Sequence, residues 1–85
     1  MHRVLLRPAA QKFLRKLRDK SLATRLVVAM RGLAANPRPP GCEKLAGVED
    51  IFRIRVGDYR IIYHIRDEVL LVLVLKIGHR REVYR

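Results

Sequence analysis

The chain has 85 residues, with 19 Lys and Arg against 8 Asp and Glu and a formal net charge of +11. This length excludes a multidomain enzyme and predicts one domain over residues 1–85. Hydrophobic residues make up 49% of the chain and recur at regular spacing, which excludes a disordered protein. The charge favours a polyanionic partner, either nucleic acid or an acidic protein, and does not distinguish between the two.

Cysteine usage and apolar runs indicate the compartment. The single cysteine, Cys42, cannot form an intramolecular disulfide, and no signal-peptide pattern follows the first residues. The longest apolar run, residues 69–75, is far below the roughly 20 residues that cross a bilayer. We therefore expect a cytoplasmic protein with no membrane-spanning segment and no membrane partner.

The first half of the chain predicts a short strand and two helices. Residues 4–6 are apolar, and Pro8 follows where proline favours the first turn of a helix. Apolar residues then recur at helical spacing over residues 10–17, opposite a cationic face. Ser21 is the expected N-cap of a second helix, which Asn36-Pro37 ends. The buried stripe expected for this helix is Leu22, Leu26, Ala29, Met30 and Leu33.

The second half changes to the period of strands. Residues 37–50 hold prolines and glycines and predict a surface connection, which is locally acidic. The alternation and apolar runs beyond it predict strands over residues 51–56, 59–66 and 69–77, with turns at Gly57-Asp58 and Asp67-Glu68 and an end at Gly78. The expected fold class is α+β: an N-terminal strand, a two-helix hairpin, then antiparallel strands forming a small sheet packed on the helices.

Three arginines are predicted to converge on this sheet. A two-residue turn at Gly57-Asp58 places Arg55 opposite Arg60, with Arg53 two residues further along the same face. We call Arg53, Arg55 and Arg60 the arginine face. Like charges directly opposite are destabilising, so the arrangement favours a multivalent anion between them, for which phosphate suits guanidinium forks. A solvated polar face is the alternative interpretation.

The segment after the last predicted strand adds Arg80, Arg81 and Tyr84, placed to close one end of the arginine face. A tyrosine in this position, taken alone, is more typical of a packing residue or of a platform on which a base stacks. His79 lies beside Arg80 and is a further candidate for contact with RNA, although a hydrogen-bonded surface histidine is the alternative.

Four further residues carry weaker signals. His64 falls on the predicted arginine face, and Glu43 could in principle act as a base from its loop. Nothing near Cys42 marks it as a nucleophile. The histidines, His2 included, are scattered without metal-ligand spacing, so we expect no metal and no other cofactor.

Three segments together resemble the RelE branch of the RelE/ParE toxin superfamily. They are Phe52-Arg53-Ile54-Arg55-Val56, Gly57-Asp58-Tyr59-Arg60-Ile61-Ile62-Tyr63 and Ile77-Gly78-His79-Arg80-Arg81-Glu82-Val83-Tyr84-Arg85. The resemblance extends over almost the whole chain, including Lys44-Leu45-Ala46-Gly47 before the sheet. It implies a RelE-like fold and the toxin of a type II toxin–antitoxin pair. RelE-like members are ribosome-dependent endoribonucleases that cleave mRNA in the A site and are neutralised by a cognate antitoxin.

The resemblance also implies catalytic residues. The positions that match the family are Arg53, Arg55, Arg60, Arg80 and Tyr84. The implied reaction needs no metal: the RNA 2′-OH attacks the adjacent phosphorus and leaves a 2′,3′-cyclic phosphate and a free 5′-OH. We expect the arginine face to bind the phosphate, Tyr84 to orient or deprotonate the 2′-OH, and Arg80 to assist the leaving oxygen. Additional RNA contacts are expected from Arg81 and His79.

One departure from the family concerns the general base. Several members have lysines where this chain has Arg53 and Arg55, and an arginine cannot give up its proton as a lysine can. The electrostatic role survives this change, and the identity of the base is left open.

Partners and alternatives follow from the same features. An acidic amphipathic segment of the antitoxin would complement the basic surface, wrapping the toxin in a heterotetramer or larger assembly. The five matched positions favour the nuclease. The alternatives are a ParE-like poison of DNA gyrase and a non-catalytic RNA- or ribosome-binding module, in which the arginines hold phosphates and the tyrosine only stacks.

Overall fold

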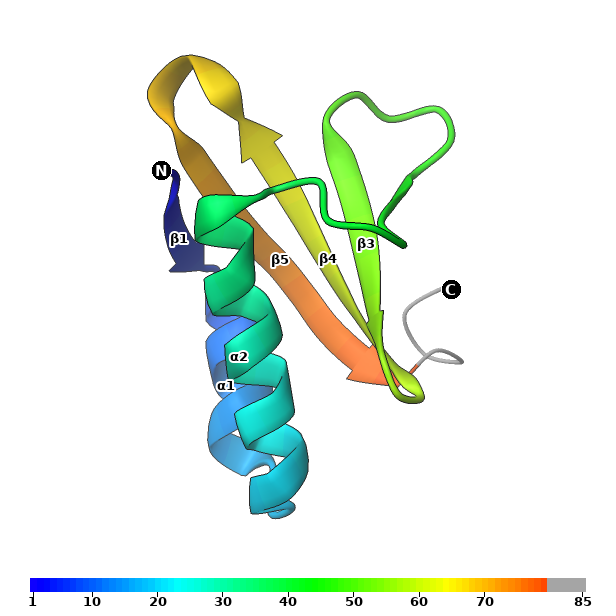
Figure 1. Ribbon diagram of the computed structural model, residues 1–85. Coiled ribbons are helices and arrows are strands. Elements are labelled where there is room, and N and C mark those ends of the chain that lie inside the picture. The colour runs from blue at the N-terminus through cyan, green and yellow to red at the C-terminus, as the bar shows by residue number, and fades with distance from the viewer. Residues whose placement is uncertain (80–85) are drawn as a thin grey trace.

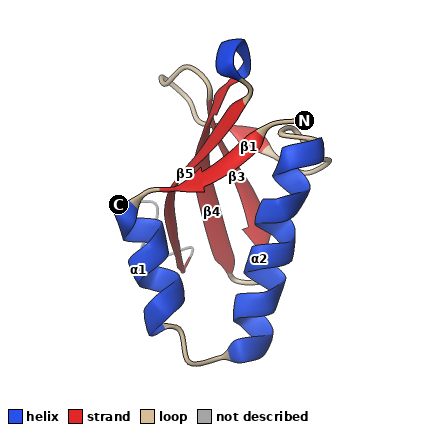
Figure 2. Ribbon diagram, turned by 90° about the vertical axis from the view of Figure 1, so that its left-hand side faces the viewer, coloured by secondary structure: helices blue, strands red, loops and turns tan. Residues whose placement is uncertain are grey.

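The computed structural model describes residues 1–79 and shows two helices covering one face of a five-stranded sheet (Figures 1 and 2). The elements in chain order are β1 (Arg3–Leu6), α1 (Pro8–Lys16), α2 (Lys20–Ala35), β2 (Glu43–Lys44), β3 (Ile51–Val56), β4 (Tyr59–Arg66), a 3₁₀ turn (Asp67–Val69) and β5 (Leu71–His79). The predicted α+β class and element order are confirmed.

The sheet has the strand order β1-β5-β4-β3-β2 and is mixed. β1 runs parallel to β5, with Val4 opposite Val72, and the chain between them contains both helices and the other three strands, so it exceeds the long connection that parallel neighbours require. The other neighbours are antiparallel. The predicted hairpin register is confirmed, since Val56 pairs with Tyr59 and Arg55 pairs with Arg60.

A glycine with positive φ makes the β3–β4 turn. Gly57 has a φ of +60°, and it occupies the first central position of the two-residue turn, where a type II′ turn requires glycine. The guanidinium of Arg25 from α2 lies against this turn, only 3.3 Å from where a Cβ on Gly57 would stand. The turn that sets the register of the arginine face therefore favours glycine by its backbone conformation, and a Cβ at position 57 would also press on the Arg25 guanidinium.

The start of α2 differs from the prediction. The N-cap is Asp19, whose Oδ1 accepts a hydrogen bond from the backbone N–H of Leu22 at 3.0 Å. The prediction of Ser21 as the cap is wrong, because the helix begins at Lys20 and already contains Ser21. A carboxylate satisfies the free N–H groups of the first turn and is stabilised by the positive end of the helix dipole.

The core lies between the helices and the sheet. The buried helical residues are Ala10 of α1 and Leu26, Met30 and Leu33 of α2. The buried stripe predicted for the second helix is therefore confirmed at these three α2 residues. The sheet contributes the alternate residues that face the helices: Ile54, Val56, Ile61, Tyr63, Ile65, Val72, Val74 and Ile77. Tyr63 donates its hydroxyl hydrogen bond to the Pro37 carbonyl at 2.7 Å, which ties the loop after α2 to the sheet. Burial raises the pKa of this hydroxyl above its ordinary range.

Two strand boundaries differ from the predictions. The connection over residues 37–50 contains the two-residue strand β2. The strand predicted over residues 69–77 instead covers Leu71–His79, because Asp67–Val69 form a 3₁₀ turn that closes with Leu70 at a left-handed φ of 50°. The pairing of β4 with β5 also departs from a regular hairpin, because its register shifts between Ile62 and Tyr63.

Among residues 1–79, no helix has the length and apolar character needed to span a bilayer.

Candidate phosphate-binding site

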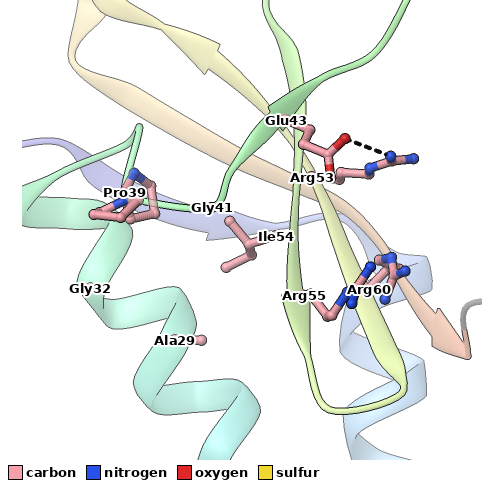
Figure 3. A pocket seen from close by; sticks show the side chains of 10 residues that line it. Ala29, Gly32, Pro39, Gly41, Glu43, Arg53, Ile54, Arg55 and Arg60 are labelled. Atoms are coloured by element: carbon pink, nitrogen blue, oxygen red, sulfur yellow. Dashed lines mark hydrogen bonds and ion pairs between the residues drawn. The ribbon is translucent and has the colours of Figure 1, made fainter.

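The β3–β4 hairpin assembles the arginine face. Arg53 and Arg55 alternate along β3, and Arg60 of β4 lies directly opposite Arg55 (Figure 3). The three differ in exposure, because Arg55 is exposed, the Arg53 side chain is 24% exposed and Arg60 is only 6% exposed. The structure therefore brings together the three arginines that sequence reasoning placed on one face, with the innermost charge held away from water.

Arg60 lies on the central strand of the sheet. It pairs with Arg55 on β3 and with Gly78 on β5. An arginine keeps its proton even when buried. A fixed positive charge in a region of low dielectric attracts an incoming anion more strongly than an exposed charge does.

A carboxylate accompanies this row of cations. Glu43 of β2 lies directly opposite Arg53, and its Oε2 accepts a hydrogen bond from the Arg53 NH2 group at 2.9 Å. Sequence reasoning placed Glu43 in a loop and considered it only as a base. A two-residue strand gives no alternation by which this pairing could be recognised.

A cleft of about 480 Å³ opens beside the site, along β3 and between α2 and the loop before β2. Arg53, Arg55, Arg60 and Glu43 all line it (Figure 3). Its other lining residues are small or apolar: Ala29, Gly32, Pro39, Pro40, Gly41 and Ile54. The cleft thus combines three cations and one carboxylate with an uncharged wall, a surface suited to an extended phosphodiester backbone.

The structure places His64 and His79 on opposite faces of the sheet. His79 pairs with Tyr59, and the two rings meet edge-on with their centroids 5.5 Å apart. The ring of Tyr59 also packs against that of Phe13 of α1, with a centroid separation of 5.8 Å. Because Tyr59 and Arg60 are adjacent in β4, His79 belongs to the helix-covered side of the sheet. His64 shares the face of Arg60 but lies four positions further along β4, opposite Ile51.

The other predicted residues are Cys42 and the three that follow β5. Cys42 is half-buried and packs against the core. Arg80, Arg81 and Tyr84 lie outside the described residues. Within residues 1–79, no group of three or more His, Cys, Asp or Glu side chains is arranged to hold a metal ion.

The fold and site define a small, basic α+β protein whose sheet carries a cationic cleft. The chain matches the family described as ParE toxin of type II toxin–antitoxin system, parDE, over residues 4–84, and it belongs to this family within the RelE/ParE toxin superfamily.

Relatives and solved structures identify the chain as RelE-like within this superfamily. Toxin RelG of Mycobacterium tuberculosis is 33% identical over 76 residues, which cover 89% of this chain and 87% of that protein. A putative RelE-like toxin of Escherichia coli is 31% identical over 81 residues, covering 93% and 83% of the two chains.

Two crystal structures share the fold. A chain of the archaeal RelE–RelB complex from Pyrococcus horikoshii superposes with a TM-score of 0.82 and 28% identity, covering 95% of this chain and 97% of that one. The isolated E. coli RelE toxin gives a TM-score of 0.81 and 28% identity, covering 99% and 92%. The RelE-like fold predicted from sequence is confirmed.

Proposed function

We propose that this toxin is a ribosome-dependent endoribonuclease that cleaves mRNA in the A site without a metal ion and thereby inhibits translation. The observation that carries the proposal is the direct opposition of Arg55 and Arg60 at the cleft, with Arg53 beside them. Such an arrangement of like charges is stabilised when a phosphate group lies between the guanidinium groups. The likeness to proteins named RelE supports the same function.

The proposed reaction is an attack of the RNA 2′-OH on the adjacent phosphorus. As the new bond closes a 2′,3′-cyclic phosphate, the 2′-OH gives its proton to the base; the bond to the 5′-oxygen breaks, and that oxygen takes up a proton from water. Arg60, fixed by burial, stabilises the charge that develops on the non-bridging oxygens, because preorganised donors favour the transition state over the ground state. The more exposed Arg53 and Arg55 bind and position the backbone.

The proton transfers are assigned to the segment beyond residue 79. Arginines remain protonated, so no member of the arginine face serves as the base. We propose that Tyr84 orients or deprotonates the 2′-OH and that Arg80 assists the leaving oxygen. Arg81 adds an RNA contact. His79, whose ring packs against Tyr59 on the helix-covered side of the sheet, is proposed as a further RNA contact outside the arginine face.

We also propose a cognate antitoxin as the partner of this toxin. Solved relatives include the archaeal RelE–RelB complex and the intact E. coli RelBE toxin–antitoxin complex. A net charge of +11 complements an acidic amphipathic segment, which would wrap the toxin and screen the arginine face in a heterotetramer or larger assembly. Because its substrate is mRNA on ribosomes, the proposed site of action is the cytoplasm.

Primer extension on a translated mRNA, with and without ribosomes, tests this function. We expect new cuts in the A-site codon that require ribosomes and that disappear with Arg80→Ala and Tyr84→Phe. Lys12→Gln, which removes an exposed cation from α1, is the control and should leave the cuts in place. Cleavage that survives in both tail variants would contradict the assigned roles, and retained RNA binding without cuts by the wild type would indicate a non-catalytic module.

A gyrase poison is the second candidate, because the matching family is described as ParE toxin. In that case the arginine face has no hydrolytic task. Supercoiling and DNA-cleavage assays with purified gyrase distinguish the two: stabilised gyrase–DNA breaks together with intact mRNA would replace the nuclease by the gyrase function.

A further inference from the structure

The contact between Glu43 and Arg53 occupies one arginine of the candidate site. The two residues are direct cross-strand partners on β2 and β3, and their charged groups are joined at 2.9 Å (Figure 3). The Glu43 side chain is 60% exposed and that of Arg53 is 24% exposed, so the pair lies at the mouth of the cleft rather than in the core. An incoming RNA therefore meets this carboxylate early.

The carboxylate lies on the same side of the sheet as the cations. Residues that pair directly across neighbouring strands share a face, which places Glu43 with Arg53, and Arg55 with Arg60, in one row. A carboxylate presents to a guanidinium the same edge of two oxygens that a phosphodiester presents. Glu43 and an RNA phosphate are thus rivals for the same donors on Arg53.

The ion pair between Glu43 and Arg53 is expected to add little to the stability of the fold. Exposed ion pairs contribute little to stability, and β2 is already joined to β3 through its backbone pairing at Glu43 and Lys44. The pair does, however, place a negative charge where it opposes an approaching phosphate backbone. Its main effect falls on binding rather than on folding.

Resting on the proposed function, we propose that Glu43 is an internal competitor of the RNA phosphate at Arg53 and a determinant of specificity for ribosome-held RNA. Free RNA must displace the carboxylate before it engages all three arginines, which weakens its binding. An mRNA held in place on the ribosome is presented at a high effective concentration, so it displaces the carboxylate readily. The competition thereby suppresses binding to free RNA more than cleavage on the ribosome.

Binding of a short single-stranded RNA with 2′-O-methyl groups, which block the attacking hydroxyl, measures this competition without cleavage. By fluorescence anisotropy at physiological salt, Glu43→Gln should bind about two- to fivefold tighter than the wild type, the range expected for removing an exposed ion-pair competitor. Glu68→Gln is the matched control, because it removes the same charge from a pair with Arg66 on the β4–β5 connection. It should change the affinity much less, since screening limits distant charges.

A double variant that combines Arg53→Gln with Glu43→Gln tests whether the tighter RNA binding acts through Arg53. In an Arg53→Gln background, Glu43→Gln should no longer tighten binding. With Arg53 present, Glu43→Gln should change the cleavage of mRNA on ribosomes by a smaller factor than it changes the affinity for free RNA. Equal affinities of Glu43→Gln and Glu68→Gln would overturn the competition. Loss of ribosomal cleavage in Glu43→Gln with unchanged RNA affinity would also overturn it, because the carboxylate would then act in the reaction.

The same titrations separate this inference from the proposed function. Weaker RNA binding by Arg53→Gln, Arg55→Gln and Arg60→Gln, with no tightening in Glu43→Gln, would reject the competitor and retain the site. RNA binding that is insensitive to all three arginine substitutions would reject the site, and the competitor with it. Melting temperatures of the variants that match the wild type would show that each affinity is measured on folded protein.

Discussion

Arg55 and Arg60 are directly paired across β3 and β4, and both line the cleft beside α2. Like charges in this position destabilise a sheet by about 0.2–1 kcal/mol relative to neutral residues. The fold retains this repulsion at the proposed phosphate site, where a bound phosphate would relieve it. Stability and activity are therefore expected to oppose each other at this pair.

Arg55→Gln tests that opposition, because Arg55 is the exposed member of the pair. The free energy of unfolding should rise by up to about 1 kcal/mol as the repulsion disappears. Cleavage of mRNA on ribosomes should fall by about 10²-fold as one phosphate donor is lost. Urea denaturation and primer extension measure the two effects. Lys12→Gln, an exposed cation removed from α1, should produce neither, and a destabilised Arg55→Gln would contradict the electrostatic account.

Asp19 and Ser21 offer a direct comparison at the start of α2. The Asp19 carboxylate accepts the Leu22 N–H, while Ser21 lies within the helix and is exposed. Asp19→Ala should lower the free energy of unfolding by about 1 kcal/mol, the usual cost of losing an N-cap. Ser21→Ala should have little effect or stabilise slightly, since alanine has the higher helix propensity. Urea denaturation of both variants decides, and the reverse order would restore Ser21 as the cap.

The sequence predicted correctly those elements that are set by neighbouring residues alone. Alternation along residues 51–56 and the Gly57-Asp58 turn were sufficient to place Arg55 opposite Arg60. The start of β5 could not be obtained in this way, because the run over residues 69–77 is apolar on both faces and gives no register. The 3₁₀ turn and left-handed Leu70 that displace the strand depend on tertiary context.

The candidate site shows the same division. The arginine face followed from the hairpin alone, whereas the Glu43–Arg53 pair required a two-residue strand that no periodicity reveals. The pairing of Arg60 with Gly78 was not expected either, because the last strand was predicted to end at Gly78. His79 was grouped with the tail that follows it, but pairing with Tyr59 turns it toward α1. Contacts distant in sequence decided each of these features.

Asp67 makes stability depend on pH in the acidic range. Its carboxylate accepts hydrogen bonds from Arg38 and His2, both at 2.9 Å. These two partners, of which Arg38 has the larger effect, hold the pKa of Asp67 below the usual 3.8. A lowered carboxyl pKa contributes stability that is present above the unfolded-state pKa and lost as the pH falls through the folded-state value.

Asp67→Asn should therefore be less stable than the wild type at pH 7, and the difference should shrink as the pH falls toward about 3. Urea midpoints at the two pH values measure it. Glu49→Gln, which removes an exposed carboxylate from the loop before β3, controls for net charge. A difference that stays constant with pH would show that the carboxylate contributes no such linkage.

Tyr63 makes the opposite prediction at alkaline pH. Its buried hydroxyl donates to the Pro37 carbonyl, and burial raises its pKa above the ordinary value of 10. The stability gained from the neutral hydroxyl is present below pH 10 and is lost as the pH rises toward the folded-state value. Tyr63→Phe should cost about 1–2 kcal/mol at neutral pH, since it leaves a carbonyl without its donor. In urea denaturation the gap to the wild type should narrow above pH 10; a widening gap would contradict the account.

The arginine face is proposed to stabilise the transition state of mRNA cleavage, and Arg60 is its innermost charge. The most direct measurement is the cleavage rate of an mRNA on programmed ribosomes by Arg60→Gln, with Arg60→Lys in parallel and circular dichroism melting to confirm that both variants fold. We predict a fall of about 10²–10³-fold for Arg60→Gln. Arg60→Lys should lie between, because it keeps the charge and loses the fork. A folded Arg60→Gln that cleaves at the wild-type rate would contradict the claim.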